Sequence, residues 1–326
     1  MHDVFQQLPD SCANEAREAH PLDVARRVSQ AEEQDTGPMW SASPVPTTPS
    51  HPGLAADTPR VSVVIPAYNE ALNLAHVLPR IPGTVAEVVL VDGHSTDETI
   101  QVAQSVLPSI RIVRQYGRGK GDAVRCGVRA ATGDIIVMMD ADGSTDPGEI
   151  SRFVDALIHG ADVAKGSRFL RVPHRLAGSA EITLVRRLGN SGLNLLVNLL
   201  FGTHFTDLCY GFNAFWRESL ERFDVDCDGF EVETLISLRA FKARLRMVEV
   251  PSFERQRLNG ASNLRAFRDG WRVLKTIARE KANGQSVIHH ATARVAHRVA
   301  RRAPADARQS ALSQPARSTS ELQPDG

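Results

Sequence analysis

The chain has 326 residues, 42% of them hydrophobic and 23% charged, so it can bury one or two ordinary cores. Its 38 Lys and Arg residues balance its 38 Asp and Glu residues, which argues against nucleic acid as the main partner and against disorder throughout. No apolar run reaches the roughly 18 residues of a membrane span, and the N-terminus lacks a secretory signal pattern. Four scattered cysteines argue against zinc and disulfide scaffolds. We therefore expect a globular protein of the reducing cytoplasm.

Composition divides the chain into a central domain and two arms. Residues 1–60 are polar and rich in proline, and residues 284–326 are a low-complexity tail rich in Ala and Arg. We expect both arms to be disordered. The domain between them, 61–283, is expected to contain a nucleotide half, 61–142, and an acceptor half, 143–283, that ends in an amphipathic helix.

Short β-branched runs alternate with helical stretches in the first half. The predicted strands are Val61–Pro66, Val88–Asp92, Ile110–Arg114 and Ile135–Asp140, and the predicted helices are Ala71–Leu78, Thr99–Leu107 and Asp122–Ala131. This alternation predicts a buried, mostly parallel sheet with helices on both faces, the doubly wound α/β class. Further elements are predicted in the second half: helices at Glu149–Ile158, Leu184–Leu200, Val232–Phe241 and Leu264–Lys281, and strands at Asp162–Gly166, Cys209–Trp216 and Arg246–Pro251.

Polar segments follow three of the predicted strands, at 66–70, 92–97 and 140–142. Because ligands bind beyond the carboxyl ends of strands in open α/β sheets, the three segments would line one crevice. Asp140 and Asp142 are two residues apart, so both side chains can point into the crevice if the chain is extended there. Like charges held that close need a cation. We expect Mg²⁺ or Mn²⁺, shared with a substrate diphosphate.

The motifs in these segments resemble those of the family 2 glycosyltransferases of GT-A fold. They read PAYNE at 66–70, DGHSTD at 92–97, RGKGDA at 118–123, TGDIIVMMDAD at 132–142, GSRF at 166–169 and R-x-x-G-x-S at 257–262. Their order and spacing are most similar to those of the dolichyl- and polyprenyl-phosphate mannosyltransferase branch. The resemblance implies a GT-A fold and an inverting, metal-dependent transfer of a hexose from a GDP- or UDP-linked donor. The implied acceptor is polyprenyl phosphate.

The resemblance also assigns roles to individual residues. Contacts with the nucleoside and base are implied for Pro66, Tyr68, Glu70, Val91 and Asp92. Contacts with the ribose, metal and diphosphate are implied for Asp140, Ala141 and Asp142. Arg168 and Arg257 would lie near the diphosphate, where a cation offsets the charge that grows on the leaving group.

The chain departs from the branch at three places. Ser144 stands where the branch usually has Gln, so the metal ligands would be Asp140, Asp142 and Ser144. Asn263 replaces a frequent Lys, a loss for which Lys120 or Arg118 can compensate. Gly93 replaces a second Asp, and the next residue, His94, would either face the base or occupy a solvated turn.

The nature of the acceptor decides whether a general base is needed. A hydroxyl acceptor needs one, and Glu231, Glu233 and Asp207 are the candidates. Glu231 and Glu233 open a predicted helix and could instead serve as partners of its dipole. A phosphate acceptor is already anionic and needs only positioning. The cations available for that are Arg168, Arg171, Arg175, Arg186 and Arg187.

The last predicted helix combines an apolar and a basic stripe. The apolar stripe consists of Leu264, Phe267, Trp271, Leu274 and Ala278, and the basic stripe of Arg265, Arg268, Arg272, Lys275 and Arg279. One interpretation is an interfacial helix on an anionic leaflet, which would make the protein peripheral on the inner face of the membrane. The other is that the apolar stripe packs on the domain and the basic stripe is solvated.

Three alternatives to transfer onto polyprenyl phosphate stay open. The acceptor could be a soluble molecule or a glycan hydroxyl. The chain could be a non-catalytic nucleotide-sugar-binding module, an interpretation favoured by Ser144 and Asn263 and opposed by the pair Asp140 and Asp142. A sugar nucleotidyltransferase is less compatible, because its first loop is generally basic and rich in glycine, unlike residues 66–70.

Overall fold

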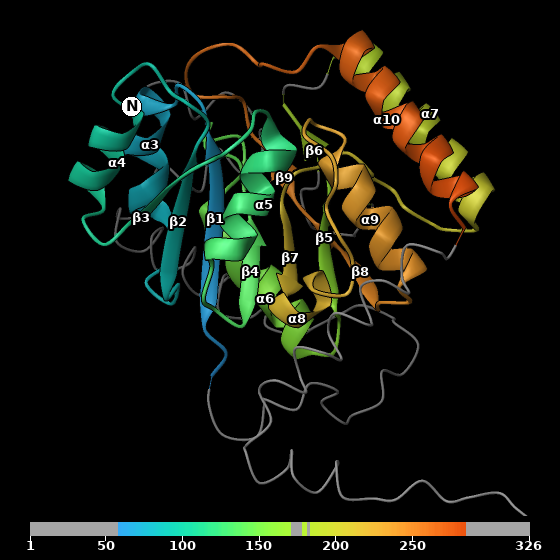
Figure 1. Cartoon of the computed structure of the whole chain (residues 1–326), viewed down its shortest axis with the longest axis horizontal. Helices are drawn as coiled ribbons and strands as arrows, with labels where there is room; N and C mark the ends of the chain where they lie inside the picture. The colour runs from blue at the N-terminus through green and yellow to red at the C-terminus, as the bar shows by residue number, and fades with distance from the viewer. Residues whose placement is uncertain (1–57, 171–177, 181–182, 285–326) are drawn as a thin grey trace, which may run out of the picture. The chain divides into compact units, whose positions relative to one another are not determined.

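The computed structural model describes residues 58–170, 178–180 and 183–284. Nearly all of the two predicted arms, and the candidates Arg171 and Arg175, lie outside the described residues. The described residues form a seven-stranded sheet flanked by helices, with strand order β3-β2-β1-β4-β7-β5-β8 (Figure 1). These strands are β1 (Val61–Ala67), β2 (Glu87–Asp92), β3 (Arg111–Arg114), β4 (Ile135–Met138), β5 (Val163–Ser167), β7 (Asn213–Trp216) and β8 (Met247–Pro251). A separate two-stranded sheet pairs β6 (Gly178–Ser179) with β9 (Phe253–Glu254).

Helices connect the strands and cover both faces of the sheet (Figure 1). The α-helices are α3 (Ala71–Val77), α4 (Thr99–Val106), α5 (Lys120–Ala130), α6 (Ile150–Ile158), α7 (Leu184–Phe201), α8 (Arg217–Leu220), α9 (Val232–Lys242) and α10 (Ala266–Ala282). Two short 3₁₀ helices are η2 (Leu78–Arg80) and η3 (Pro147–Glu149). The doubly wound, mostly parallel α/β architecture predicted from the sequence is therefore confirmed.

Two predicted strand boundaries were wrong. The strand predicted to reach Asp140 ends at Met138, and the strand predicted from Cys209 begins at Asn213. In the second case the chain turns before the strand, and the turn is closed by the Asn213 side chain, which donates to the Tyr210 carbonyl. β7 then runs antiparallel to both of its neighbours, β4 and β5. The early end of β4 leaves Asp140 and Asp142 on a loop.

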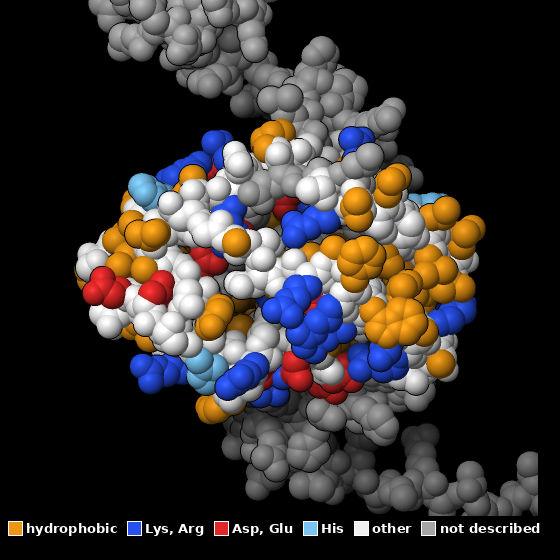
Figure 2. All heavy atoms as spheres, turned by 90° about the horizontal axis from the view of Figure 1, so that it is seen from above, with side chains coloured by type: hydrophobic (Ala, Val, Ile, Leu, Met, Phe, Trp, Pro, Cys, Tyr) orange, Lys and Arg blue, Asp and Glu red, His pale blue; other side chains and the backbone are white. Residues whose placement is uncertain are grey.

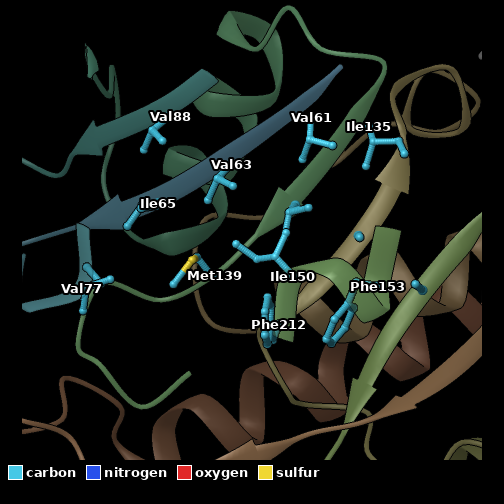
Figure 3. Packing of buried hydrophobic residues seen from close by; sticks show 14 of the residues in the cluster. Val61, Val63, Ile65, Val77, Val88, Ile135, Met139, Ile150, Phe153 and Phe212 are labelled. Atoms are coloured by element: carbon cyan, nitrogen blue, oxygen red, sulfur yellow. The ribbon is translucent and has the colours of Figure 1, made fainter. Parts of the chain in front are cut away.

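The core is divided by the sheet because side chains alternate between the faces of each strand. Val63 and Ile65 of β1 belong to one buried cluster with Ile150, Phe153 and Phe212, which Figure 3 shows packed together. The intervening Val64 belongs to the cluster on the other face. Burial on both faces explains why β1 reads as a continuous apolar run, as expected for a central strand of a parallel sheet.

A third cluster forms where α7, α9 and α10 meet. Val197 of α7, Leu238 of α9, and Val273 and Ile277 of α10 are all buried there. The inward face of α10 is therefore made by Val273 and Ile277 and not by the predicted apolar stripe. Phe267 and Trp271 of that stripe are 90% and 60% exposed.

The topology brings the polar segments to one edge of the sheet. β1, β2 and β4 are parallel, with Ala67 paired to Asp92 and Val64 to Met138. β5 runs in the same direction as β4, because both are antiparallel to β7. All four strands therefore end at the upper edge in Figure 1. Within the described residues, no helix has the length and apolar character to cross a bilayer.

Gly127 allows α5 to pack closely on the sheet. A Cβ at this position would lie 2.3 Å from Val64 Cγ1 and 2.9 Å from Val91 Cγ2. We expect Gly127→Ala to lower the free energy of unfolding by about 1–3 kcal/mol, because neither valine can move within its strand. Gly192→Ala is the matched control, since nothing lies within 4 Å of its added Cβ on α7. The free energy of unfolding of that variant, measured with urea, should rise by about 0.5–1 kcal/mol. Equal effects would contradict the packing argument.

Candidate active site

A cleft of about 890 Å³ opens at the carboxyl edge of the sheet. Figure 2 looks onto this edge and shows Lys and Arg side chains around a hollow with acidic side chains inside it. The cleft brings together eleven of the predicted site residues: Pro66, Tyr68, Glu70, Lys120, Asp140, Ala141, Asp142, Ser144, Arg168, Glu233 and Arg257. Segments that are far apart in the sequence therefore meet in one concave site.

Lys120 lies between two carboxylates. Its Nζ is 2.6 Å from Asp140 Oδ1 and 2.7 Å from Glu233 Oε1. Burial alone would lower the pKa of Lys120, but the two carboxylates outweigh it and raise that pKa, so the lysine is charged at neutral pH. Burial raises the pKa of Glu233, against the opposing effect of Lys120. Glu233 is thus occupied by an ion pair and is not presented as a free base.

Gly211 provides room beside this cluster. A Cβ there would lie 2.8 Å from Lys120 Nζ and 2.9 Å from Asp140 Oδ2. Any side chain at Gly211 would therefore compete for the space that the lysine and the carboxylate use. The glycine keeps this part of the cleft floor open.

Arg257 likewise lies between two carboxylates. Its Nη1 is 3.0 Å from Glu70 Oε1, and its Nη2 is 2.9 Å from Asp142 Oδ2. Burial alone would lower the pKa of Arg257, but Asp142 and Glu70 raise it. The pKa of Glu70 is raised by burial, in spite of Asn73 and Arg257.

Backbone hydrogen bonds on either side of Arg257 hold it in this position. The amide of Arg255 donates to the Ser144 carbonyl at 2.7 Å, and the amide of Leu258 donates to the Asp142 carbonyl at 3.1 Å. Gly143 has φ +80°, and a Cβ there would lie 2.6 Å from Leu258 Cδ1. The segment around Arg257 therefore lies along the loop that carries Asp142, and Gly143 permits the close approach.

Arg168 forms the third such cluster. Its Nε is 2.6 Å from Asp207 Oδ2, and its Nη1 is 3.0 Å from Glu254 Oε2. Burial alone would raise the pKa of Asp207, but Arg168 lowers it. Asp207 also accepts from Asn190 at 3.0 Å and is fully buried. Its role in the described structure is to hold Arg168.

Four of the predicted site residues do not line the cleft. Val91 is buried in the sheet, and Asp92 accepts from the Ser95 amide behind the cleft wall. Asp207 lies beneath Arg168. Glu231 accepts from the Gly229 amide at 3.2 Å, and among the described residues its Oε2 has no hydrogen-bond partner.

The departures from the family motif have distinct surroundings. The amide of Ser144 donates to Asp142 Oδ1 at 2.9 Å, so Ser144 orients that carboxylate. His94 has φ +65°, and its Nε2 lies 2.9 Å from the Gly117 carbonyl. Asn263, Arg118 and His94 all line the cleft.

Sequence reasoning missed Glu254 and Tyr210. Glu254 binds Arg168, and the Arg168 guanidinium lies 4.9 Å from the Tyr210 ring centroid. Glu254 follows the predicted last strand, a position that could have marked it as an edge residue. The ring contact follows from the turn before β7, for which the sequence offered no signal.

Comparison with known proteins identifies the family of the chain. The sequence model of glycosyl transferase family 2 matches residues 62–223. Glycosyltransferase AglJ of Haloferax volcanii is 32% identical over 68% of this chain and 73% of its own length. Polyprenol monophosphomannose synthase of Mycolicibacterium smegmatis is 32% identical over 65% of this chain and 84% of its own length. Dolichyl-phosphate hexose transferase of H. volcanii is 30% identical over 67% and 92%, respectively.

A solved structure supports the fold. Glucosyl-3-phosphoglycerate synthase of Mycobacterium tuberculosis, crystallised with Mn²⁺, UDP and glucosyl-3-phosphoglycerate, superimposes with a TM-score of 0.55. It is 23% identical, over 69% of this chain and 80% of its own. The chain belongs to glycosyl transferase family 2, and it is a glycosyltransferase of GT-A fold.

The pair formed by Asp207 and Arg168 gives a stability prediction. Asp207→Asn removes one of the two carboxylates that pair with the buried guanidinium of Arg168. We therefore expect the free energy of unfolding, measured with urea at neutral pH, to fall by about 3–5 kcal/mol. The folded-state pKa of Asp207 is lowered, so its stabilisation is present above the unfolded pKa of about 3.9 and declines as the pH falls below it. The deficit of the variant should shrink over that range.

The control is Asp155→Asn, the same chemical change at an exposed position on α6. We expect it to stay within about 0.5 kcal/mol of the wild type at every pH. A loss for Asp207→Asn no larger than that of the control would refute the buried pair.

Proposed function

We propose that this chain transfers a hexose, with inversion, from a nucleoside diphosphate sugar to a polyprenyl phosphate, with the help of a divalent cation. One observation carries the proposal: Asp140 and Asp142 lie on the floor of the cleft, and each is held by a cation that a second carboxylate shares. The names of two relatives, polyprenol monophosphomannose synthase and dolichyl-phosphate hexose transferase, support the acceptor.

The donor set fits a hard divalent cation such as Mg²⁺ or Mn²⁺. Lys120 and Arg257 each face two carboxylates, so both clusters contain one acidic group more than basic groups. Among the described residues, no group of three or more Asp, Glu, His or Cys side chains is placed to hold a metal. Asp140 and Asp142 would therefore supply only part of the ligands. This suits an ion that keeps waters and binds substrate phosphates.

The bound cation would neutralise the diphosphate as it leaves. Arg257 would hold the same group from the chain's own side, since its guanidinium pairs directly with the Asp142 carboxylate and so lies beside the proposed cation position. Pro66, Tyr68 and Glu70 would contact the nucleoside, together with Ala141. Asp92 would act from behind the wall by accepting from the Ser95 amide in the loop that follows β2, and Val91 by packing the strand against α5.

Inversion is supported by the lack of a free nucleophile. Glu70, Asp140, Asp142, Glu233 and Glu254 line the cleft, and each is paired with Lys120, Arg168 or Arg257. The sixth lining carboxylate, Asp269, accepts from the Arg265 amide and lies 4.0 Å from Arg272. A carboxylate engaged in this way is a poor covalent nucleophile. Direct attack of the acceptor on the anomeric carbon, with loss of the nucleoside diphosphate, requires none.

The same pairing favours a phosphate acceptor over a hydroxyl. Glu233 is paired with Lys120, and Asp207 is fully buried under Arg168. Glu231 does not line the cleft. A phosphate acceptor is anionic without a base, and Arg186 lies at the cleft wall to meet it.

The exposed faces of α7 and α10 support docking on an anionic membrane. Figure 2 shows hydrophobic side chains gathered on the side of the molecule where these helices lie. The exposed apolar residues are Val185, Leu188, Leu195 and Leu199 of α7 and Phe267, Trp271 and Leu274 of α10. Arg268 and Lys275 are exposed beside them, and each cation near an anionic leaflet adds about 1 kcal/mol. We propose that this surface, at the mouth of the cleft, meets the bilayer that holds the acceptor.

Transfer can be measured with labelled nucleotide sugars and polyprenyl phosphate, followed by partition into organic solvent. We expect label in the organic phase and a fall of about 10²–10³-fold in kcat for Arg257→Ala, whose charge counts most as the leaving group departs. Arg255→Ala is the matched control, because Arg255 pairs with Asp146 and does not line the cleft. Label that stays in the aqueous phase on a small phosphorylated acid would replace the lipid acceptor by a soluble one. Equal rates for the two variants would contradict the role of Arg257.

Docking on the membrane can be tested with the double variant Leu199→Ser and Trp271→Ser. Both side chains are exposed, so thermal stability should change little. Binding to anionic vesicles should fall by about tenfold or more, because the apolar area entering the bilayer is lost. Leu72→Ser removes a side chain that is 70% exposed on α3 and should leave vesicle binding unchanged. A protein that never sediments with anionic vesicles would refute the proposed surface.

A further inference from the structure

A second, smaller cavity of about 240 Å³ lies next to the catalytic cleft. Lys120 and Phe230 line both, so the two cavities share a wall. Arg265, Arg268 and Arg272 line only the smaller cavity. These arginines take no part in the ion pairs that organise the catalytic cleft.

The charges around this cavity do not cancel. Asp269 is the carboxylate among its lining residues, and its Oδ2 accepts from the Arg265 amide at 2.7 Å. Its Oδ1 is 4.0 Å from Arg272 Nη1. Among the described residues, no carboxylate forms an ion pair with the guanidinium of Arg265 or Arg268. A second carboxylate, that of Glu231, lies beside Arg272, because Arg272 Nη1 and Glu231 Oε2 would each lie 2.5 Å from a Cβ at Gly229. Three guanidinium groups therefore face two carboxylates, and the lysine in the wall is already neutralised by Asp140 and Glu233.

The backbone adds to the positive potential of this cavity. Gly119 and Lys120, at the N-terminus of the eleven-residue helix α5, are among its lining residues. The first N–H groups of a helix carry partial positive charge and favour anions. The shape of the wall depends on Gly119, which has φ +89° and whose Cβ would lie 2.2 Å from the Asp228 carbonyl oxygen.

We propose that Arg265, Arg268 and Arg272 form a second anion site that binds a phosphate group, distinct from the site proposed for the donor diphosphate. Guanidinium groups bind phosphate through paired hydrogen bonds, and several of them around one cavity suit a phosphate ester. Phe267 and Trp271, which alternate with these arginines along α10, are exposed and apolar. A phosphate attached to an acyl glycerol would place its polar group in the cavity and its chains along these side chains. A free phosphate ester offers the same group without the chains.

The test compares two double variants that remove the same number of charges. Arg268→Gln with Arg272→Gln changes the cavity, whereas Arg187→Gln with Lys275→Gln removes two cations of α7 and α10 that do not line it. Binding is measured with glycerol 3-phosphate by calorimetry and with phosphatidylcholine vesicles, with and without phosphatidylglycerol, by sedimentation. No transfer is measured, so the outcome does not depend on the proposed reaction.

With glycerol 3-phosphate we expect the cavity variant to lose about tenfold in affinity and the control variant less than about threefold. With phosphatidylglycerol vesicles both variants should bind more weakly, because Lys275 lies on the proposed docking surface, and the cavity variant should lose about tenfold more than the control. Selective loss with glycerol 3-phosphate would support the site and identify a free phosphate ester as its ligand. Selective loss with phosphatidylglycerol vesicles alone would support the site and identify a lipid headgroup. Equal losses for both variants would show diffuse attraction between α10 and the leaflet and overturn the proposal, as would the absence of binding to either probe.

Discussion

The structure depends on one electrostatic constraint at the carboxyl edge of the sheet, where each of three buried or half-buried cations is shared by two carboxylates. Lys120, Arg168 and Arg257 are the three cations, and no two of them use the same acid. In the buried pair of Arg168 and Asp207, removing one partner costs about 3–5 kcal/mol, and the partly buried pairs of Lys120 and Arg257 act in the same sense on the geometry of the cleft. Because each cluster keeps one acid in excess, the floor of the cleft is suited to receive a further cation.

The fold supplies the partners of each cluster from separate parts of the chain. Lys120 begins α5, Asp140 follows β4, and Glu233 lies in the first turn of α9. Arg168 follows β5, whereas Glu254 lies on β9. Parallel strands that end at one edge make these meetings possible, and the short pairing of β6 with β9 holds Glu254 near Arg168. The sheet therefore determines the site, and the loops contribute its chemistry.

The sequence predicted the seven strands of the main sheet, most helices and the acidic edge, because burial patterns and strand ends are local signals, but it did not predict the short pairing of β6 with β9. It did not predict the pairing of the charged residues. Arg257 lies 187 positions from Glu70, and the hydrogen bonds between the 142–144 loop and the 255–258 segment that join them leave no local pattern. Asp207 was predicted as a candidate base because the sequence does not reveal that this residue is buried under Arg168. That burial depends on the tertiary fold. The sequence also did not determine which side of α10 is exposed. Only packing against α7 and α9 selects Val273 and Ile277 as the inner face of this helix.

The central claim is that Asp140 and Asp142 hold a divalent cation together with the donor diphosphate. A crystal structure with Mn²⁺ and a nucleoside diphosphate tests it most directly, because anomalous scattering locates the metal. We expect a metal peak that contacts Asp142 and the diphosphate, with Arg257 on the diphosphate, and loss of that peak in Asp142→Ala. A diphosphate bound in the cleft with no metal at these carboxylates, or a metal peak that survives in Asp142→Ala, would contradict it.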